Sequence, residues 1–327
     1  TRETLEESLD LAWRIDINEF SMNHFYKNRL VRCYLGATNP MRQDTDPDTG
    51  FCPSDDFRLS YLFTANYAGP LPIVNTALNL GPSSDLDVQE RRAASFFFTP
   101  LHAGFTLPEK TRLALNVTEG SGSERAVGFR PTSSFQNESE GGIHLGTAVA
   151  ISGAAASPNM GYHTSSAVAF LMTLFNVRLG WWVPHPARAS WKQPAPLFSF
   201  KYLIRELFGF AGLDSDFVYL SDGGHFENLA VYELLRRRCR FIMVLDGEQD
   251  GDFAFGGLGG LIRKARTDFQ CEIDLDPEQI ARRTPEGFSH SHCAVGKLRY
   301  CDTNEEGYLL YLKLSVTGDE DRDILQY

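Results

Sequence analysis

Val218-Tyr-Leu-Ser-Asp-Gly-Gly-His-Phe-Glu-Asn-Leu229 is the stretch from which both fold and function can be argued. The apolar run at 217–220 predicts a buried strand, which delivers Asp222 onto a two-glycine turn. A helical pattern then begins near Asn228. A strand that ends in an acid and leads into a helix is a common way to present a carboxylate at the edge of an α/β sheet, where such acids often take part in chemistry.

Other apolar runs extend this pattern along the chain. Residues 71–80, 94–99 and 241–245 predict further strands, and 298–300 with 308–314 predict a hairpin across the acidic turn 302–307. Helices are expected over 5–35, 165–177, 201–210, 228–238 and 256–266. Because helices alternate with apolar strands, we expect one α/β domain with a mostly parallel sheet.

The composition narrows the class of protein. The 327 residues are 43% hydrophobic, which is enough for a full core. A net charge of −11 argues against a nucleic-acid partner, because such a surface needs clustered Lys and Arg. The most apolar window, 167–175, is shorter than the roughly 20 residues that a membrane span needs. The chain begins at Thr1 rather than Met, so we expect it to be a piece of a longer protein.

The six cysteines show no Cys-x-x-Cys pair and no zinc-ligand spacing with histidine. We therefore expect reduced thiols, a cytoplasmic location and no metal site.

Three segments resemble one enzyme family. Tyr219-Leu-Ser-Asp-Gly-Gly-His-Phe-Glu-Asn-Leu229 resembles the Asp-Gly-Gly block of patatin-like phospholipases. Ala148-Val-Ala-Ile-Ser-Gly-Ala-Ala-Ala-Ser-Pro158 looks like the family's upstream Ala-Ser-Ala-Ala-Pro segment. Pro72-Ile-Val-Asn-Thr-Ala-Leu-Asn79 with Phe97-Phe-Thr-Pro100 is similar to the cytosolic phospholipase A2 branch. The resemblance covers about 60–250 and leaves 251–327 as a C-terminal extension with a β-hairpin.

The resemblance implies a patatin-like three-layer α/β/α fold, incomplete at both ends, and a lipid acyl hydrolase with a serine–aspartate dyad. The family's nucleophile lies in Gly-x-Ser-x-Gly, and no such segment occurs in the 327 residues. The family's glycine-rich oxyanion loop is also absent. The resemblance therefore implies a single hydrolase domain fragment, 1–327, that carries the acid and lacks the serine.

Asp222 is the predicted general base, because a serine hydroxyl is a poor nucleophile until a base takes its proton. Gly223 and Gly224 suit this position, since glycine allows unusual backbone angles and keeps bulk away from a substrate. The alternative is that Asp222 only caps the helix that follows it.

Four other residues are weaker candidates for a role in the site. His225 is three residues from Asp222, but proximity in sequence is no evidence for a triad. Asn228 is expected to cap or brace the next helix. Ser152 lies in Ala-Ile-Ser-Gly-Ala, which has only one of the two glycines that a nucleophile elbow needs. Ser157 is expected to line or support the cleft.

Asp246 and residues 175–191 also bear on the predicted function. Asp246 ends an apolar strand, and we expect a structural carboxylate bonded to loop amides. Residues 175–191 combine tryptophans with arginines, a mixture found both in cores and at membrane surfaces.

The sequence thus predicts a hydrolase of phospholipids or other acyl lipids, with a possible membrane-surface contact and no cofactor. The alternative is a catalytically inactive module that binds lipid or a protein partner.

Overall fold

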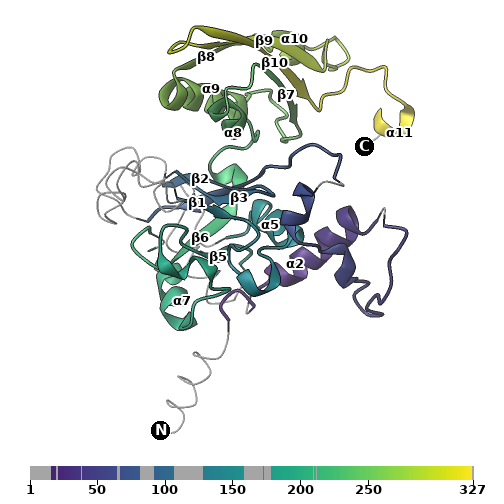
Figure 1. Cartoon of the computed structure of the whole chain (residues 1–327). Coiled ribbons are helices and arrows are strands. Elements are labelled where there is room, and N and C mark those ends of the chain that lie inside the picture. The colour runs from purple at the N-terminus through teal and green to yellow at the C-terminus, as the bar shows by residue number, and fades with distance from the viewer. Residues whose placement is uncertain are drawn as a thin grey trace. The chain divides into compact units, whose positions relative to one another are not determined.

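The computed structural model describes residues 16–19, 21–37, 39–64, 67–81, 92–106, 128–157, 172, 178–208, 210 and 212–325. The chain divides into two compact units, Thr1–Phe226 and Glu227–Tyr327, and each is described by itself (Figure 1). The single hydrolase domain expected from the sequence stays a prediction.

The first unit is built on a six-stranded antiparallel sheet. Its strand order is β4-β3-β2-β1-β6-β5, and the sheet curls into a half-barrel. The bounds are β1 Val74–Asn79, β2 Ala93–Phe98, β3 His102–Gly104, β4 Phe129–Pro131, β5 Trp181–Pro184 and β6 Phe217–Asp222. β1 lies between β2 and β6, with Thr76 opposite Asp222. The predicted strands at 71–80, 94–99 and 217–220 are confirmed.

Short helices cover this sheet. Their bounds are α2 Asn23–Leu30, α5 Leu145–Ser152 and α7 Ser199–Leu207, and a π-helical turn, Val31–Leu35, follows α2. α5 packs against β1 and β6, and α2 packs against α5. The main core lies where α5 meets the sheet, and it includes Leu78, Phe96, Ile151 and Leu220, all fully buried.

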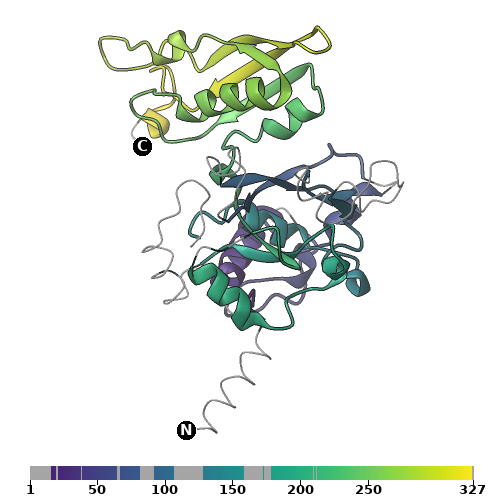
Figure 2. The same cartoon turned by 90° about the vertical axis from the view of Figure 1, so that its left-hand side faces the viewer.

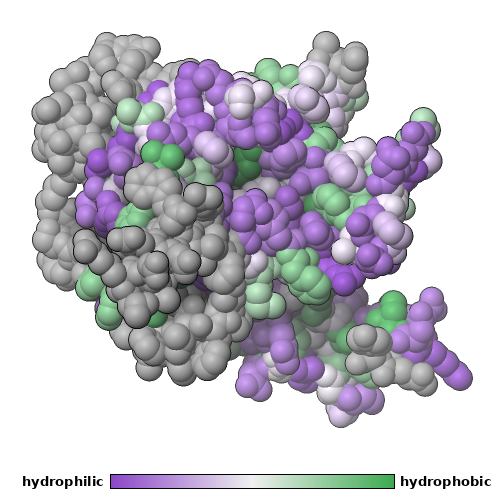
Figure 3. Space-filling model, turned by 90° about the horizontal axis from the view of Figure 1, so that it is seen from below, coloured by the Kyte–Doolittle hydropathy of each residue, from purple (hydrophilic) through white to green (hydrophobic). Residues whose placement is uncertain are grey.

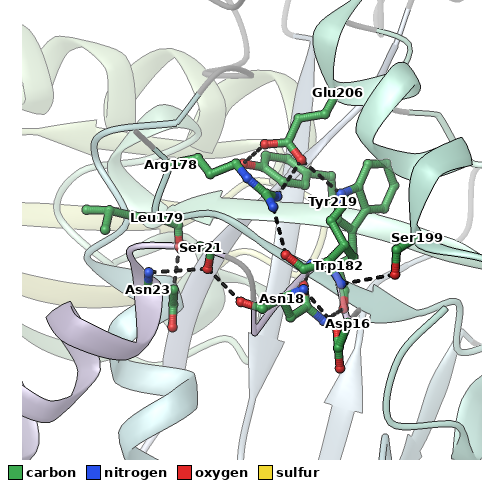
Figure 4. Close-up of polar contacts among 11 residues, drawn as sticks. Asp16, Asn18, Ser21, Asn23, Arg178, Leu179, Trp182, Ser199, Glu206 and Tyr219 are labelled. Carbon is green, nitrogen blue, oxygen red and sulfur yellow. Dashed lines mark hydrogen bonds and ion pairs between the residues drawn. The ribbon is translucent and has the colours of Figure 1, made fainter. Parts of the chain in front are cut away.

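A buried polar network joins α7 to β5, β6 and the chain before α2 (Figure 4). The Glu206 carboxylate accepts hydrogen bonds from Arg178 at 2.9 Å, from the Trp182 indole at 3.1 Å and from the Tyr219 hydroxyl at 3.3 Å. The side-chain amide of Asn18 donates a hydrogen bond to the backbone oxygen of Trp182 and accepts one from the Trp182 N–H, each 2.9 Å long. These bonds fix which side of α7 faces the sheet.

The second unit is a mixed sheet with helices on one side (Figures 1 and 2). Its order is β7-β10-β9-β8, with β7 parallel to β10 and the other pairs antiparallel. The bounds are α8 Tyr232–Arg236, β7 Phe241–Asp246, α9 Gly256–Phe269, β8 Cys271–Asp274, α10 Glu278–Ala281, β9 Cys293–Tyr300, β10 Glu305–Lys313 and α11 Arg322–Leu325. The predicted C-terminal hairpin is confirmed as β9–β10, with Tyr300 opposite Glu305.

The expected three-layer α/β/α fold with a mostly parallel sheet is wrong. The six-stranded sheet is antiparallel throughout, and β7–β10 is the one parallel pair among the described strands. Continuous apolar runs led to the error, because a strand buried on both faces reads as apolar whether its neighbours are parallel or antiparallel.

The other element predictions have mixed outcomes. The helices expected at 201–210, 228–238 and 256–266 are found as α7, a shorter α8 and α9. Apart from Met172, which is helical, the helix expected at 165–177 lies outside the described residues, and so does the first part of the helix expected at 5–35. None of the described helices combines the length and apolar character needed to cross a bilayer.

Candidate functional site

Asp222 is the last residue of β6, where the chain turns into a short 3₁₀ segment, Gly223–His225. Its Oδ1 atom accepts a hydrogen bond from the backbone N–H of Gly224 at 2.7 Å. The side chain is half-buried, so the carboxylate remains accessible. The structure therefore presents Asp222 at the end of a strand, with one carboxylate oxygen held by its own turn.

Gly223 is needed for close approach rather than for an unusual backbone angle. Neither Gly223 nor Gly224 has a positive φ. A Cβ atom on Gly223 would lie 2.8 Å from the backbone oxygen of Asn75 in β1, closer than real Cβ contacts come. The absence of a side chain thus lets the turn lie directly against the neighbouring strand.

Tyr26 is a residue of this region that the sequence did not reveal. Its hydroxyl would lie 2.6 Å from a Cβ atom on Gly153, the residue that follows α5. Burial raises the pKa of Tyr26, and the negative charge of Asp222 raises it further. Tyr26 therefore stays a neutral hydroxyl near the Asp222 carboxylate. No motif connects two residues so far apart in the chain.

Ser152 reaches the same region from the end of α5. Its hydroxyl donates a hydrogen bond to the backbone oxygen of Asn75 at 2.7 Å, the oxygen that Gly223 approaches. The backbone N–H of Asp222 also donates a hydrogen bond to the backbone oxygen of Ala154 at 3.3 Å. Ser152 is the last residue of its helix, where the partial charge is negative and disfavours a developing oxyanion. The structure brings Ser152 and the Asp222 turn together without the setting of an activated nucleophile.

Ser157 supports the region from within the core. Its side chain is fully buried and donates a hydrogen bond to the backbone oxygen of Ala154 at 3.1 Å. Ser157 thus holds the segment after α5 in place, and its predicted part in a cleft stays a prediction.

His225 belongs to a polar cluster with Ser221 and Asn79, separate from Asp222. The hydroxyl of Ser221 lies 2.8 Å from the Nδ1 atom of His225 and accepts a hydrogen bond from the Asn79 amide at 2.8 Å. The Ser221 hydroxyl thus bridges the Asn79 amide and the His225 imidazole. Ser221 is fully buried, and successive side chains of a strand point to opposite faces, so this cluster and Asp222 face different sides of β6.

Asn228 is exposed and lies in the second unit, and its side chain makes no hydrogen bond to any residue that the structure describes. The helix start is held by Glu227 instead. Its carboxylate accepts hydrogen bonds from the N–H groups of Leu229, Val231 and Tyr232 at 2.6, 2.7 and 3.0 Å. The capping role predicted for Asn228 thus belongs to its neighbour, because a glutamate can reach N–H groups several residues ahead.

Asp246 is buried and bonded as expected for a structural carboxylate. It accepts a hydrogen bond from the Glu248 N–H at 2.8 Å and one from the Tyr311 hydroxyl, and it pairs with Lys313 at 3.3 Å. These contacts tie β7 to β10.

One group of potential metal ligands occurs among the described residues. Atoms of His292, Asp319 and Glu320 lie within 4.8 Å of one another. The Glu320 carboxylate accepts hydrogen bonds from the N–H groups of Thr317 and Gly318 at 2.7 and 2.8 Å, and these bonds lower its pKa to about 2. This local turn accounts for the cluster. All six cysteines are free thiols.

No family model, curated protein or solved structure matches this chain. The likeness to patatin-like phospholipases therefore rests on the quoted motifs alone and stays a prediction.

Proposed function

We propose that Asp222 is the general base of a carboxylic ester hydrolase that acts on phospholipids or related acyl lipids. A serine outside these 327 residues would be the nucleophile, in the manner of the patatin-like phospholipases that residues 219–229 resemble. Asp222 would take the proton from that serine as it attacks the ester carbonyl, and would pass it to the alcohol oxygen as the ester C–O bond breaks. In the second half-reaction Asp222 would take a proton from the water that attacks the acyl-enzyme, and would return it to the serine as the fatty acid leaves.

The observation that carries the proposal is the state of the Asp222 carboxylate. Among the residues that the structure describes, only the Gly224 N–H donates to the carboxylate, at Oδ1, and the side chain is half-buried at the end of a strand. A base fixed from one side, with a second oxygen available, can receive a serine hydroxyl at about 2.6–3.2 Å.

Tyr26 supports this assignment as a nearby donor. A hydroxyl whose pKa is raised by burial and by Asp222 stays protonated at neutral pH. It can therefore donate a hydrogen bond to the carboxylate or to a substrate oxygen, which would orient one against the other.

A second candidate is a catalytically inactive module that binds lipid or a protein partner. The observation in its favour is that no described serine hydroxyl hydrogen-bonds to Asp222, while Ser152 donates to Asn75 instead. An intact turn without a nucleophile would then serve binding alone.

The test uses the complete open reading frame that encodes these residues. Fatty-acid release from phosphatidylcholine in mixed micelles is measured for the unaltered protein, for Asp222→Asn and for Asp216→Asn. Asp216 is a matched control, because it is an exposed acid just before the same strand. Removal of a general base is expected to lower kcat by about 10²–10⁴-fold, and Asp216→Asn should stay near the unaltered rate.

Hydrolysis that Asp222→Asn leaves unchanged would contradict the proposal, and so would a full-length protein with no ester turnover. The 327-residue chain alone is expected to be inactive. Turnover by this chain that Ser152→Ala abolishes would instead make Ser152 the nucleophile.

A further inference from the structure

α7 buries its one carboxylate and exposes a row of apolar side chains. Ser199, Tyr202 and Glu206 are its buried residues. Phe200 and Ile204 point outward, and Phe208 continues the same stripe after the helix ends. A helix on a water-exposed surface normally shows the opposite arrangement.

The exposed stripe extends beyond both ends of the helix. It comprises five apolar side chains between 36% (Ile204) and 71% (Leu197) exposed: Leu197, Phe200, Ile204, Phe208 and Phe210. The rings of Phe208 and Phe210 stack with centroids 6.2 Å apart. Figure 3 shows one face of the molecule. Most of the described residues on this face are hydrophilic, and the hydrophobic residues form small patches.

The helix cannot rotate to hide this stripe. Glu206 is held by Arg178 at 2.9 Å and by the Trp182 indole at 3.1 Å, in the interior of the first unit (Figure 4). Ser199 accepts a hydrogen bond from the backbone of Ile17 at 3.0 Å. Turning α7 over would separate the buried Glu206 carboxylate from the Arg178 charge and the Trp182 indole, which is strongly unfavourable.

The charges on the exposed side of α7 are cationic. Lys201 and Arg205 are its outward charges, because its only acid, Glu206, is buried. Arg205 pairs with Asp214 at 2.5 Å, whereas Lys201 makes no ion pair with any described residue. In a chain with a net charge of −11, a helix with apolar and cationic exposed side chains complements an anionic lipid surface.

We propose that α7 docks on a phospholipid surface, with the five-residue stripe in the boundary between headgroups and acyl chains and Lys201 among anionic headgroups. A stripe one helix wide is far smaller than the roughly 20–30 residues that each partner contributes to a stable protein interface. The choice of lipid as occupant rests on the proposed function, which gives the chain a lipid substrate.

The experiment measures co-sedimentation of the purified 327-residue chain with vesicles of phosphatidylcholine alone and of phosphatidylcholine with 30% phosphatidylserine. The unaltered chain is expected to bind both, and the anionic vesicles more tightly. Phe200→Ser with Phe208→Ser should lower the partition coefficient at least 10-fold. Phe241→Ser is the control, because Phe241 is a phenylalanine of the second unit that is 69% exposed, more than Phe200 at 46% and Phe208 at 57%. This variant should bind as the unaltered chain does.

Lys201→Glu should weaken binding to the anionic vesicles about 10-fold or more and binding to neutral vesicles much less. Far-UV circular dichroism shows whether each variant is folded. No binding by the unaltered chain would overturn the proposal, as would equal losses from the α7 and Phe241 variants. A concentration-dependent dimer that the α7 variants abolish would make a second copy of this chain the occupant and would also overturn it.

This test is independent of Asp222. Asp222→Asn is expected to bind vesicles as the unaltered chain does. Vesicle binding together with a full-length protein that lacks Asp222-dependent hydrolysis would uphold the docking surface and reject the hydrolase. Asp222-dependent hydrolysis of a soluble ester without vesicle binding would uphold the hydrolase and reject the docking surface.

Discussion

Arg178 and Glu206 form an ion pair, 2.9 Å from Nη1 to Oε2, in which neither side chain is more than 1% exposed. The Trp182 indole and the Tyr219 hydroxyl donate to the same carboxylate. Burial nevertheless raises the pKa of Glu206, since desolvation of the carboxylate outweighs these partners. The pair positions α7 on the sheet more than it adds net stability, because both charges are desolvated.

The first prediction is that Glu206→Leu destabilises the first unit by about 3–5 kcal/mol, because it removes the carboxylate that pairs with the buried Arg178 charge. The double variant Arg178→Met, Glu206→Leu should recover most of this loss. Denaturant unfolding followed by tryptophan fluorescence measures both, since all four tryptophans precede residue 226 and report the first unit alone. Equal losses in the single and double variants would contradict this account.

Six of the ten described strands were predictable from the sequence, because β1, β2, β6, β7, β9 and β10 contain short apolar runs between turn residues. The strands β3, β4, β5 and β8 were not predicted, and neither was the pairing of any strand outside the C-terminal hairpin. β1 and β2 are consecutive and antiparallel, and β6 joins β1 from more than a hundred residues away. Nothing in the local composition of β6 tells whether its neighbours run parallel or antiparallel to it.

Part of the candidate site was also predictable from the sequence, and part was not. Asp222 was found because a strand, an acid and two glycines are consecutive in the chain. Tyr26 was not, because it approaches Asp222 only through the packing of α2 against α5. The capping role went to Glu227 rather than Asn228, since side-chain length and backbone direction decided it.

The second prediction concerns acid sensitivity. His185 is fully buried, and burial lowers its pKa from 6.5 to about 4, with the Arg188 charge contributing. The folded state therefore excludes a proton that the unfolded chain binds below pH 6.5. The associated stability is present above pH 6.5, is lost as the pH falls toward 4, and reaches roughly 3 kcal/mol.

The measurement is the free energy of unfolding by tryptophan fluorescence at several values between pH 7.5 and 4.5. His185→Gln does not titrate, so its stability should fall less steeply over this interval, even if the variant is less stable at pH 7.5. Parallel curves for the two proteins would show that His185 is not the titrating group.

The third prediction separates Glu227 from Asn228 as the support for α8. Glu227 is buried and accepts three backbone N–H groups, so Glu227→Ala should cost about 2–3 kcal/mol in the second unit. Asn228→Ala should change stability by less than about 0.5 kcal/mol, because the side chain is exposed. Amide hydrogen exchange at residues 229–236 gives the local readout, and equal exchange in both variants would refute the assignment.

The last prediction tests why glycine follows Asp222. A Cβ atom on Gly223 would lie 2.8 Å from the backbone oxygen of Asn75, which belongs to the centre of the sheet and cannot yield. Gly223→Ala should therefore cost about 1–3 kcal/mol and displace the turn, so that the Gly224 amide loses its hydrogen bond to Asp222.

Gly153→Ala is the matched comparison, since its Cβ atom would meet only the hydroxyl end of Tyr26, at 2.6 Å. A side-chain end can move where a strand carbonyl cannot, so Gly153→Ala should cost less and preserve the protection of the Gly224 amide against hydrogen exchange. If Gly223→Ala left that amide protected, the turn would tolerate a side chain. Its geometry would then not depend on close contact with β1, and the fixed position of the Asp222 carboxylate would need another cause.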